Sequence, residues 1–127
     1  RLCARGLDDR LGGYIILEAA KKAKERGCTC GIYAATTVEE ELTKHGAARN
    51  VHIKYQWENG CGRTCTDADA IHVAGRGIPT TVMSIPLRYM HNPAEVCSME
   101  DVQGCIDVLA EFLCGIGSDI CLKPLEG

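Results

Sequence analysis

The sequence predicts a single α/β domain, and three observations lead to this expectation. Apolar residues recur at helical spacing in two long segments, 11–26 and 98–115. Short runs of apolar and β-branched residues, of the length of strands, lie between these segments. A chain of 127 residues is long enough for one domain with a modest hydrophobic core. We therefore expect helices and strands packed around one core.

The two long helices have recognisable faces and ends. In the first, Gly27 can end the helix, and apolar residues repeat every fourth position: Leu11, Ile15, Ala19 and Ala23. In the second, Ser98 and Asp101 are spaced as a capping box, and Gly115 can end the helix. The apolar face of this second helix comprises Val102, Cys105, Ile106, Leu109, Phe112 and Leu113.

The remaining elements are shorter. Strands are predicted over 28–37 and 80–85 from their small, apolar and β-branched residues, and over 51–55 from alternation of apolar and polar residues. A short helix is predicted over 67–74, with Thr66 as its N-cap.

Composition and charge exclude several classes of partner. Lys and Arg number 14 and Asp and Glu 17, which gives a net charge of −3. The sequence has no basic stripe, and this argues against nucleic acid as a partner. No apolar run approaches the ~20 residues of a membrane-spanning helix. The first residues, from Arg1 on, do not resemble a signal peptide, so we expect a cytoplasmic protein.

The nine cysteines are an odd number, and most lie in apolar, periodic segments. We expect them to be mostly reduced, buried small hydrophobic residues rather than a disulfide framework. Cys28 and Cys30 are too close in sequence for the usual zinc hook. Cys61 and Cys65 are spaced as half of a zinc site or as a disulfide, but no second pair with matching spacing lies nearby, so both remain minor alternatives.

Acidic residues and one histidine lie at the ends of the predicted elements. Asp8 precedes the first helix, Glu39–Glu41 follow the first predicted strand, and His91 lies beyond the last one. Burying several carboxylates is costly unless cations neutralise them. Asp, Glu and His are the ligands that zinc, cobalt and manganese accept in proteins. The pattern therefore indicates a metal-activated water and a hydrolase.

Each of these residues also has an ordinary structural explanation. Asp8 could be an N-cap, the glutamates a solvated first helical turn, and His91 a loop residue. We favour the ligand interpretation because the segments occur together, and we expect the neighbouring Asp9 to cap the helix or to support the ligands.

In these segments the chain resembles the deblocking, or glutamyl-type, metallo-aminopeptidase family, which includes the tetrahedral aminopeptidases. The resemblance is spread over most of the chain, and its motifs occur in order. They include Leu7-Asp8-Asp9-Arg10, Thr37-Val38-Glu39-Glu40-Glu41, Thr66-Asp67-Ala68, Gly77-Ile78-Pro79-Thr80, and Arg88-Tyr89-Met90-His91 followed by Glu95-Val96.

The resemblance implies a site for two divalent metal ions, with zinc or cobalt expected and manganese as an alternative. Asp8 matches the carboxylate that bridges both ions, Glu41 a terminal ligand to one, and His91 the imidazole on the other. Glu40 matches the general base. The implied fold is a mixed sheet sandwiched by helices, as in zinc exopeptidases. The implied substrates are peptides, and the implied assembly is a homo-oligomer of dimers, with a dodecamer as the candidate.

Two ligands of the family pattern have no counterpart in the sequence. One is a His in a His-x-Asp motif, upstream of an inserted β-rich dimerisation domain. The other is an Asp between the Glu pair and the Thr-Asp-Ala segment, where Asn50 here directly precedes Val51. We therefore expect residues 1–127 to form one partial catalytic domain, lacking a segment between 50 and 51 and an N-terminal part.

Two other functions remain open at this point. The missing ligands would also suit a non-catalytic remnant or an assembly element of the same fold. Some relatives in the family carry an endoglucanase label, and a glycoside hydrolase would use two carboxylates without a metal.

Overall fold

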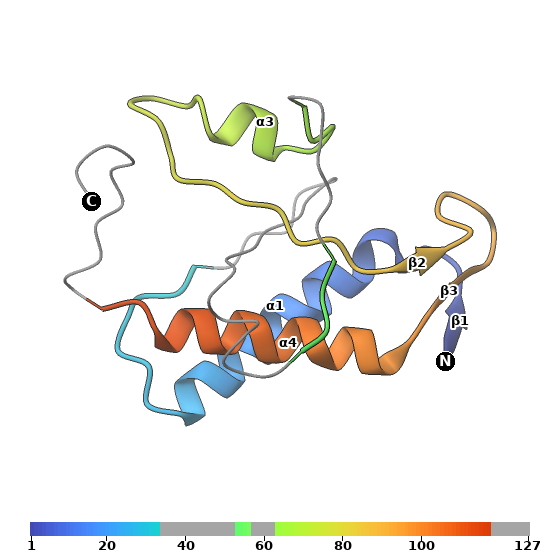
Figure 1. The fold of residues 1–127 in the computed structure, drawn as a ribbon, viewed down its shortest axis with the longest axis horizontal. Coiled ribbons are helices and arrows are strands. Elements are labelled where there is room, and N and C mark those ends of the chain that lie inside the picture. Colours follow the sequence, from blue (N-terminus) through green and yellow to red (C-terminus); the bar gives the residue numbers. More distant parts are fainter. Residues whose placement is uncertain (34–52, 57–62, 118–127) are drawn as a thin grey trace.

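The computed structural model describes residues 1–33, 53–56 and 63–117 of the chain. These residues form two long helices, one short helix and three short strands (Figure 1). In chain order the elements are β1 (Leu2–Ala4), α1 (Leu7–Glu25), α3 (Ala68–Ile71), β2 (Leu87–Arg88), β3 (Glu95–Cys97) and α4 (Met99–Cys114).

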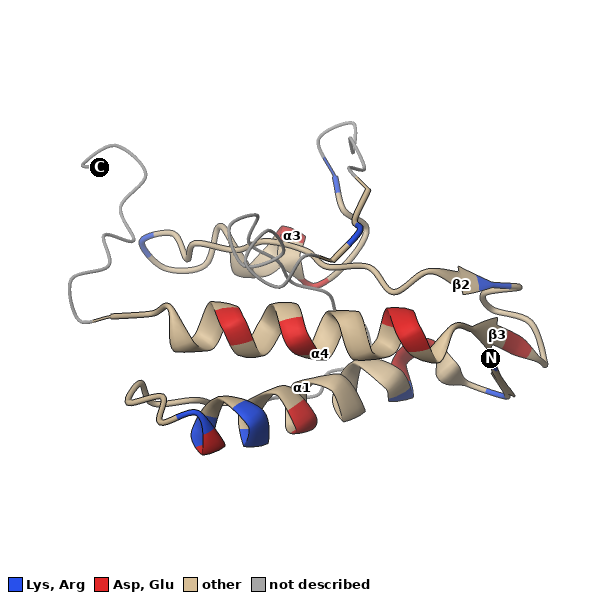
Figure 2. Ribbon diagram, turned by 60° about the horizontal axis from the view of Figure 1, so that its bottom comes forward, with Lys and Arg blue, Asp and Glu red and all other residues tan. Residues whose placement is uncertain are grey.

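Helices α1 and α4 lie side by side and run in the same direction (Figures 1 and 2). Lys22 Nζ lies 2.5 Å from Asp107 Oδ1, and Arg26 Nη2 lies 2.6 Å from Glu111 Oε2. A step of one helical turn along α1 thus matches a step of one turn along α4, as parallel helices require. These ion pairs lie at the edge of the helix contact, where the side chains remain partly exposed to water.

The sheet is antiparallel, in the order β1-β3-β2. Val96 of β3 stands opposite Cys3 of β1 on one side and opposite Arg88 of β2 on the other. Strand β1 leads into α1 and strand β3 leads into α4, so both long helices start from the same small sheet. The Ser98 side chain accepts a hydrogen bond from the backbone N–H of Glu100 and caps α4.

The hydrophobic core lies between the two long helices and the sheet. Its buried residues are Leu7, Leu11, Ile15, Ala19, Cys97, Val102, Cys105, Ile106 and Ala110. The predicted face of the first helix is confirmed, because its four repeating residues are all buried. The second face is confirmed in its first half only: Leu109, Phe112 and Leu113 are half-buried, whereas Val108 and Ala110 are buried.

The predicted strands fare less well than the helices. The strand predicted over 80–85 is wrong: this segment pairs with no other strand among the described residues, and β2 begins only after Pro86. Residues 28–33 and 53–56 are likewise not strands, while the rest of those two predictions falls outside the described residues. A strand needs a hydrogen-bonded neighbour, and composition alone does not show whether one is available.

Helices and a sheet confirm the coarse α/β expectation. The mixed sheet sandwiched by helices stays a prediction, since the described strands are all antiparallel. The short helix α3 covers part of the predicted range, and Thr66 Oγ1 accepts a hydrogen bond of 3.1 Å from the Ala68 N–H at its start. Along the described stretches, no helix has both the length and the apolar character needed to cross a membrane.

Among the cysteines that the structure describes, the expectation of burial is correct for Cys97 and Cys105 only. Cys28, Cys30 and Cys114 are half-buried, because they lie at the open ends of α1 and α4 rather than between the helices. Cys65 is exposed, and Cys61 falls outside the described residues, as does the junction of Asn50 and Val51.

Candidate functional site

Asp8 lies at the start of α1, just after the sheet. Gly6 has a φ of 66°, a left-handed conformation that suits glycine, and it turns the chain from β1 into the helix. Leu7 is buried in the core and so fixes the position of its neighbour. The peptide bond between Asp8 and Asp9 is cis. The Asp8 side chain is 34% exposed.

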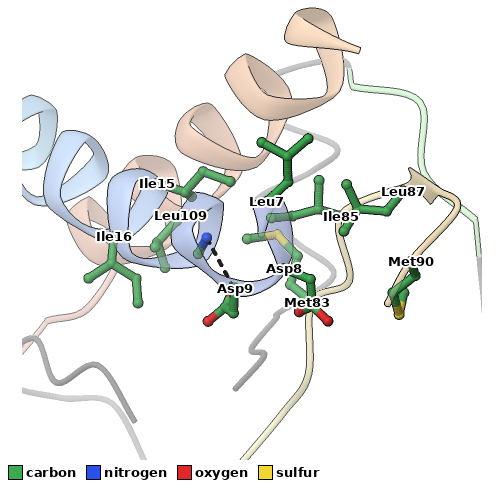
Figure 3. Close-up of a pocket in the computed structure, with 11 residues that line it drawn as sticks. Leu7, Asp8, Asp9, Ile15, Ile16, Met83, Ile85, Leu87, Met90 and Leu109 are labelled. Atoms are coloured by element: carbon green, nitrogen blue, oxygen red, sulfur yellow. Dashed lines mark hydrogen bonds between the residues drawn. The ribbon is translucent and has the colours of Figure 1, made fainter. Parts of the chain in front are cut away.

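Asp9 has a different task. Its Oδ1 accepts a hydrogen bond of 3.1 Å from the backbone N–H of Gly12, three residues further on, which is the geometry of a helix cap (Figure 3). A Cβ on Gly12 would lie 2.2 Å from the same oxygen, so the cap requires glycine there. The capping role expected for Asp9 is confirmed, and Asp8 is left available for other contacts.

His91 lies in the turn that joins β2 to β3. Tyr89 and His91 both have a positive φ, 61° and 64°, which is uncommon for residues with a side chain. The Asn92 N–H donates to the Tyr89 carbonyl over 3.1 Å and closes the turn. The His91 imidazole is 78% exposed and points back toward the start of α1.

The side chains of Asp8 and His91 meet despite their separation in sequence. His91 Nε2 lies 3.0 Å from Asp8 Oδ2. The two atoms belong to different elements, one at the start of a helix and one in a β-turn, so the contact depends on the fold. Of the four residues that the resemblance assigns to one site, Asp8 and His91 thus lie side by side. Whether Glu40 and Glu41 join them stays a prediction.

A third side chain, Glu95, accepts hydrogen bonds from the backbone of both residues. Its Oε2 accepts from the Asp8 backbone N–H over 3.1 Å, and its Oε1 accepts from the His91 backbone N–H over 2.9 Å. The residue is 2% exposed. The hydrogen bond from the Asp8 N–H, followed by that from His91, holds the pKa of Glu95 below its ordinary value against the opposing effect of burial.

Sequence reasoning gave Glu95 no role and named it only within the motif. A signal was present: Glu95 is a charged residue at the start of a run that continues with apolar Val96 and Cys97, four positions after His91. An acidic residue in such a run is either a solvent-facing strand residue or a buried group with specific partners. The structure shows that it is the second.

Glu40 and Glu41, the predicted base and terminal ligand, lie outside the described residues, as do His45, His52 and Trp57. In residues 1–33, 53–56 and 63–117, no group of three or more His, Cys, Asp and Glu side chains is arranged to hold a metal ion. Asp8 and His91 do offer a carboxylate oxygen and an imidazole nitrogen at adjacent points. This donor pair fits zinc, cobalt or manganese, with further ligands required from elsewhere.

An apolar cavity of ≈ 80 Å³ adjoins the Asp8 side of the site (Figure 3). Among the side chains that line it, only Asp8 and Asp9 are charged, and the rest are Leu7, Ile15, Ile16, Met83, Ile85, Leu87, Met90 and Leu109. Carboxylates at the edge of an apolar hollow are less hydrated than carboxylates on an open surface, which favours binding of a cation.

Comparison with known proteins identifies a family. The family described as M42 glutamyl aminopeptidase matches two segments of the chain, residues 1–52 and 45–108, which overlap around the Asn50–Val51 junction. Both Asp8 and His91 fall within the matched segments. No solved structure matches the chain significantly.

Individual relatives have related names. A candidate aminopeptidase of Acetivibrio thermocellus is 34% identical over 97 residues, or 75% of this chain and 27% of that protein. SgcX, a candidate aminopeptidase of Escherichia coli strain K12, is 32% identical over 80% of this chain and 26% of its own length. A lysyl aminopeptidase of Pyrococcus furiosus is 35% identical over 52% of this chain and 19% of its own length. The chain thus spans about a quarter of the length of the first two relatives.

Proposed function

Because this chain belongs to the M42 glutamyl aminopeptidase family, we propose that the protein that carries it is a metal-dependent aminopeptidase. One observation carries the proposal beyond family membership. His91 Nε2 and Asp8 Oδ2, two side chains of suitable ligand chemistry from distant parts of the chain, lie 3.0 Å apart, and Asp8 also lines an apolar cavity. A buried carboxylate, Glu95, accepts hydrogen bonds from the backbone N–H groups of both residues, which supports a built site at this point.

The proposed roles are distributed over four residues. Asp8, Glu41 and His91 would hold the divalent metal ions. Glu40 is the general base. The described residues support this assignment only for the approach of Asp8 to His91. The other two residues are assigned from the motif in which they occur, Thr37 to Glu41.

The proposed reaction is hydrolysis of the peptide bond that follows an N-terminal residue. When bound, the divalent ions would lower the pKa of a water molecule and polarise the scissile carbonyl. Glu40 accepts a proton as the water oxygen bonds to the carbonyl carbon. It then gives the proton to the amine nitrogen as the carbon–nitrogen bond breaks, the general acid–base role. Asp8 and His91 hold the ligand positions at a fixed separation. Recognition of the free α-amino group of the substrate limits cleavage to the terminal residue.

The ligand set of these residues is incomplete for two ions, and we propose that the rest comes from sequence that this chain does not contain. The overlap of the two family matches at residues 45–52 supports a missing stretch there. A homo-oligomer built from dimers is the proposed assembly. The proposed location is the cytoplasm.

The test separates the base from the ligands in the gene product that carries this chain. Glu40→Gln should lower turnover of aminoacyl p-nitroanilides by about 10²–10⁴-fold while metal content stays near wild type, because an amide cannot accept the proton. Glu41→Gln and His91→Ala should lose metal first, and activity as a consequence. Elemental analysis beside the activity assay distinguishes the two kinds of variant.

Three results would contradict this proposal. If Glu40→Gln loses metal and Glu41→Gln does not, the two roles are exchanged. Activity on a glucan that survives a chelator would favour the glycoside hydrolase instead. Absence of both activities from a protein that binds metal at full occupancy would favour the non-catalytic assembly element.

A further inference from the structure

We propose that Glu95 is a positioning residue that sets the separation of Asp8 and His91 by holding the backbone of both. The proposal rests on the proposed function, in which Asp8 and His91 bind metal. Neither the family match nor the motif assigns this role to Glu95, which touches no predicted substrate atom and acts through its two partners.

The sheet alone does not fix the two ligands. Its pairing ends at Ala4, opposite Glu95, and at Arg88, opposite Val96. Asp8 and His91 both lie beyond these last pairs, one in the start of α1 and one in the turn after β2. A single carboxylate spans the two, with one oxygen on each backbone N–H, at 3.1 and 2.9 Å.

The chemistry of this link requires a carboxylate. An ionised carboxylate is an acceptor at both oxygens, and a hydrogen bond to a charged group is roughly twice as strong as one between neutral groups. Glutamine has the same shape but carries an NH₂ group, which is a donor, in place of one oxygen. In a Glu95→Gln variant one of the two backbone N–H groups would therefore face a donor and lose its partner, and the ligand on that side would no longer be held.

A purely structural role is the rival explanation, since Glu95 is 2% exposed and could serve only to fold the turn. The two explanations differ in what they predict for a variant that stays folded. A positioning residue affects metal affinity without a matching loss of fold, because supporting groups around ligands typically change affinity by ~10–100-fold. A structural residue affects the two together.

The experiment uses the ¹⁵N-labelled gene product that carries this chain, as wild type, Glu95→Gln and the matched control Glu100→Gln, whose side chain is exposed in the first turn of α4. Mn²⁺ is the probe, because its preference for oxygen and nitrogen ligands avoids competition from the nine cysteines. Paramagnetic broadening of the Asp8 and His91 amide signals reports binding at this site. We expect Glu95→Gln to weaken Mn²⁺ binding there by ~10–100-fold and Glu100→Gln to leave it unchanged.

Hydrogen exchange of the same wild-type gene product covers the case in which Glu95→Gln does not fold. The backbone amides of Asp8 and His91 should exchange slowly, although the side chains of these two residues are partly or largely exposed. Both N–H groups donate hydrogen bonds to Glu95, and this protects them from exchange. Exchange at the rate of an open turn would overturn the proposal, and so would equal Mn²⁺ affinity in folded Glu95→Gln and wild type. Failure of the wild type to bind Mn²⁺ at Asp8 and His91 would instead overturn the proposed function.

A separate observation carries a second proposal, which does not depend on the first. Cys28 Sγ lies 2.9 Å from Cys30 Sγ, and both sulfurs point at the Leu113 carbonyl oxygen, at 3.3 and 3.5 Å. We propose that this pair is a modification site at which a low-molecular-weight disulfide closes an intramolecular disulfide. A Cys28 or Cys30 thiolate attacks the reagent and displaces one thiol. The second cysteine then attacks the mixed disulfide and displaces the other, so the protein loses two hydrogens and the reagent becomes two thiols.

Trypsin provides a direct test. Cleavage after Arg26 and Lys44 gives a peptide, residues 27–44, whose only cysteines are Cys28 and Cys30. Folded protein is treated with glutathione disulfide, and its free thiols are then alkylated. The mass of this peptide should show no alkyl group and should be two hydrogens lower than that of the reduced peptide. The Cys28→Ser control should retain an alkyl group or a glutathione at Cys30. A wild-type peptide that is alkylated twice, or joined to the peptide of Cys114, would overturn the proposal.

Discussion

The helix pair with its small sheet and the segment from residue 63 to residue 79 are built in opposite ways. In the first region, residues distant in sequence converge on one core, such as Leu11 of α1 and Ile106 of α4. In the second region only Ala68 is buried. The hydrogen bonds described there are local: Asp69 accepts from the backbone N–H groups of Thr64 and Cys65, a few residues away.

The difference shows where a binding site can be held with accuracy. Asp8, His91 and Glu95 all belong to the first region, at the junction of the sheet with α1. Side chains fixed by several elements keep their separation, whereas local turns hold only their own residues. Four measurements test this contrast, three of them on stability.

The largest expected effect is on the core. Ile15 is 3% exposed and Ile78 is 49% exposed, so the same substitution can be made in both regions. Ile15→Ala should lower the free energy of unfolding by about 2–5 kcal/mol through lost burial and a residual cavity. Ile78→Ala should change it by less than about 0.5 kcal/mol. Urea unfolding followed by circular dichroism measures both, and equal losses would contradict the division into two regions.

The next effect concerns alkaline pH. Burial, followed by the nearby Asp101 charge, raises the pKa of the Cys105 thiol from 9.0 to about 11. Because the folded state holds this proton more tightly, the contribution to stability is complete below pH 9.0 and is lost as the pH rises through about 11. The loss attributable to Cys105 should be about 2–3 kcal/mol at high pH.

The measurement compares unfolding free energies from neutral to alkaline pH in wild type, Cys105→Ala and Cys65→Ala. The alkaline loss should be smaller in Cys105→Ala than in wild type. It should be unaltered in Cys65→Ala, because Cys65 is exposed. If Cys105→Ala shows the same alkaline loss as wild type, the thiol is not buried as the structure has it.

The smallest effect is expected from the ion pairs between α1 and α4. Lys22 and Asp107 are 41% and 29% exposed, so water and salt screen their attraction. A double-mutant cycle with Lys22→Met and Asp107→Asn should give a coupling energy of about 0.2–1 kcal/mol, reduced by added salt. A coupling much larger than this would mean that the helices are held by charge more than by the core.

The sequence predicted the parts of the fold that repeat along the chain. The buried stripe of α1, from Leu11 to Ala23, follows from spacing alone, and the start of α4 follows from Ser98. The sheet could not be predicted in the same way. Strands β1 and β3 have three residues each, too few to show alternation, and they exist because they pair with one another across most of the chain.

The candidate site likewise has a part that the sequence predicts and a part that only the fold shows. Asp8 and His91 were identifiable because their chemistry and motifs stand out in the sequence. The role of Glu95 was not, because it depends on two backbone N–H groups that come together only in the folded chain. The apolar spacing around a residue predicts whether it is buried, but not which polar groups it will meet.

The most direct test of the account is whether Asp8 and His91 bind the same ion. Mn²⁺ affinity is measured by amide broadening in wild type, Asp8→Ala, His91→Ala and the double variant. If one ion binds both side chains, broadening is centred on residues near Asp8 and His91. Each single substitution should then remove most of the affinity, and the second should add little, a strongly non-additive cycle. Additive losses, or broadening centred elsewhere on the chain, would contradict the shared site.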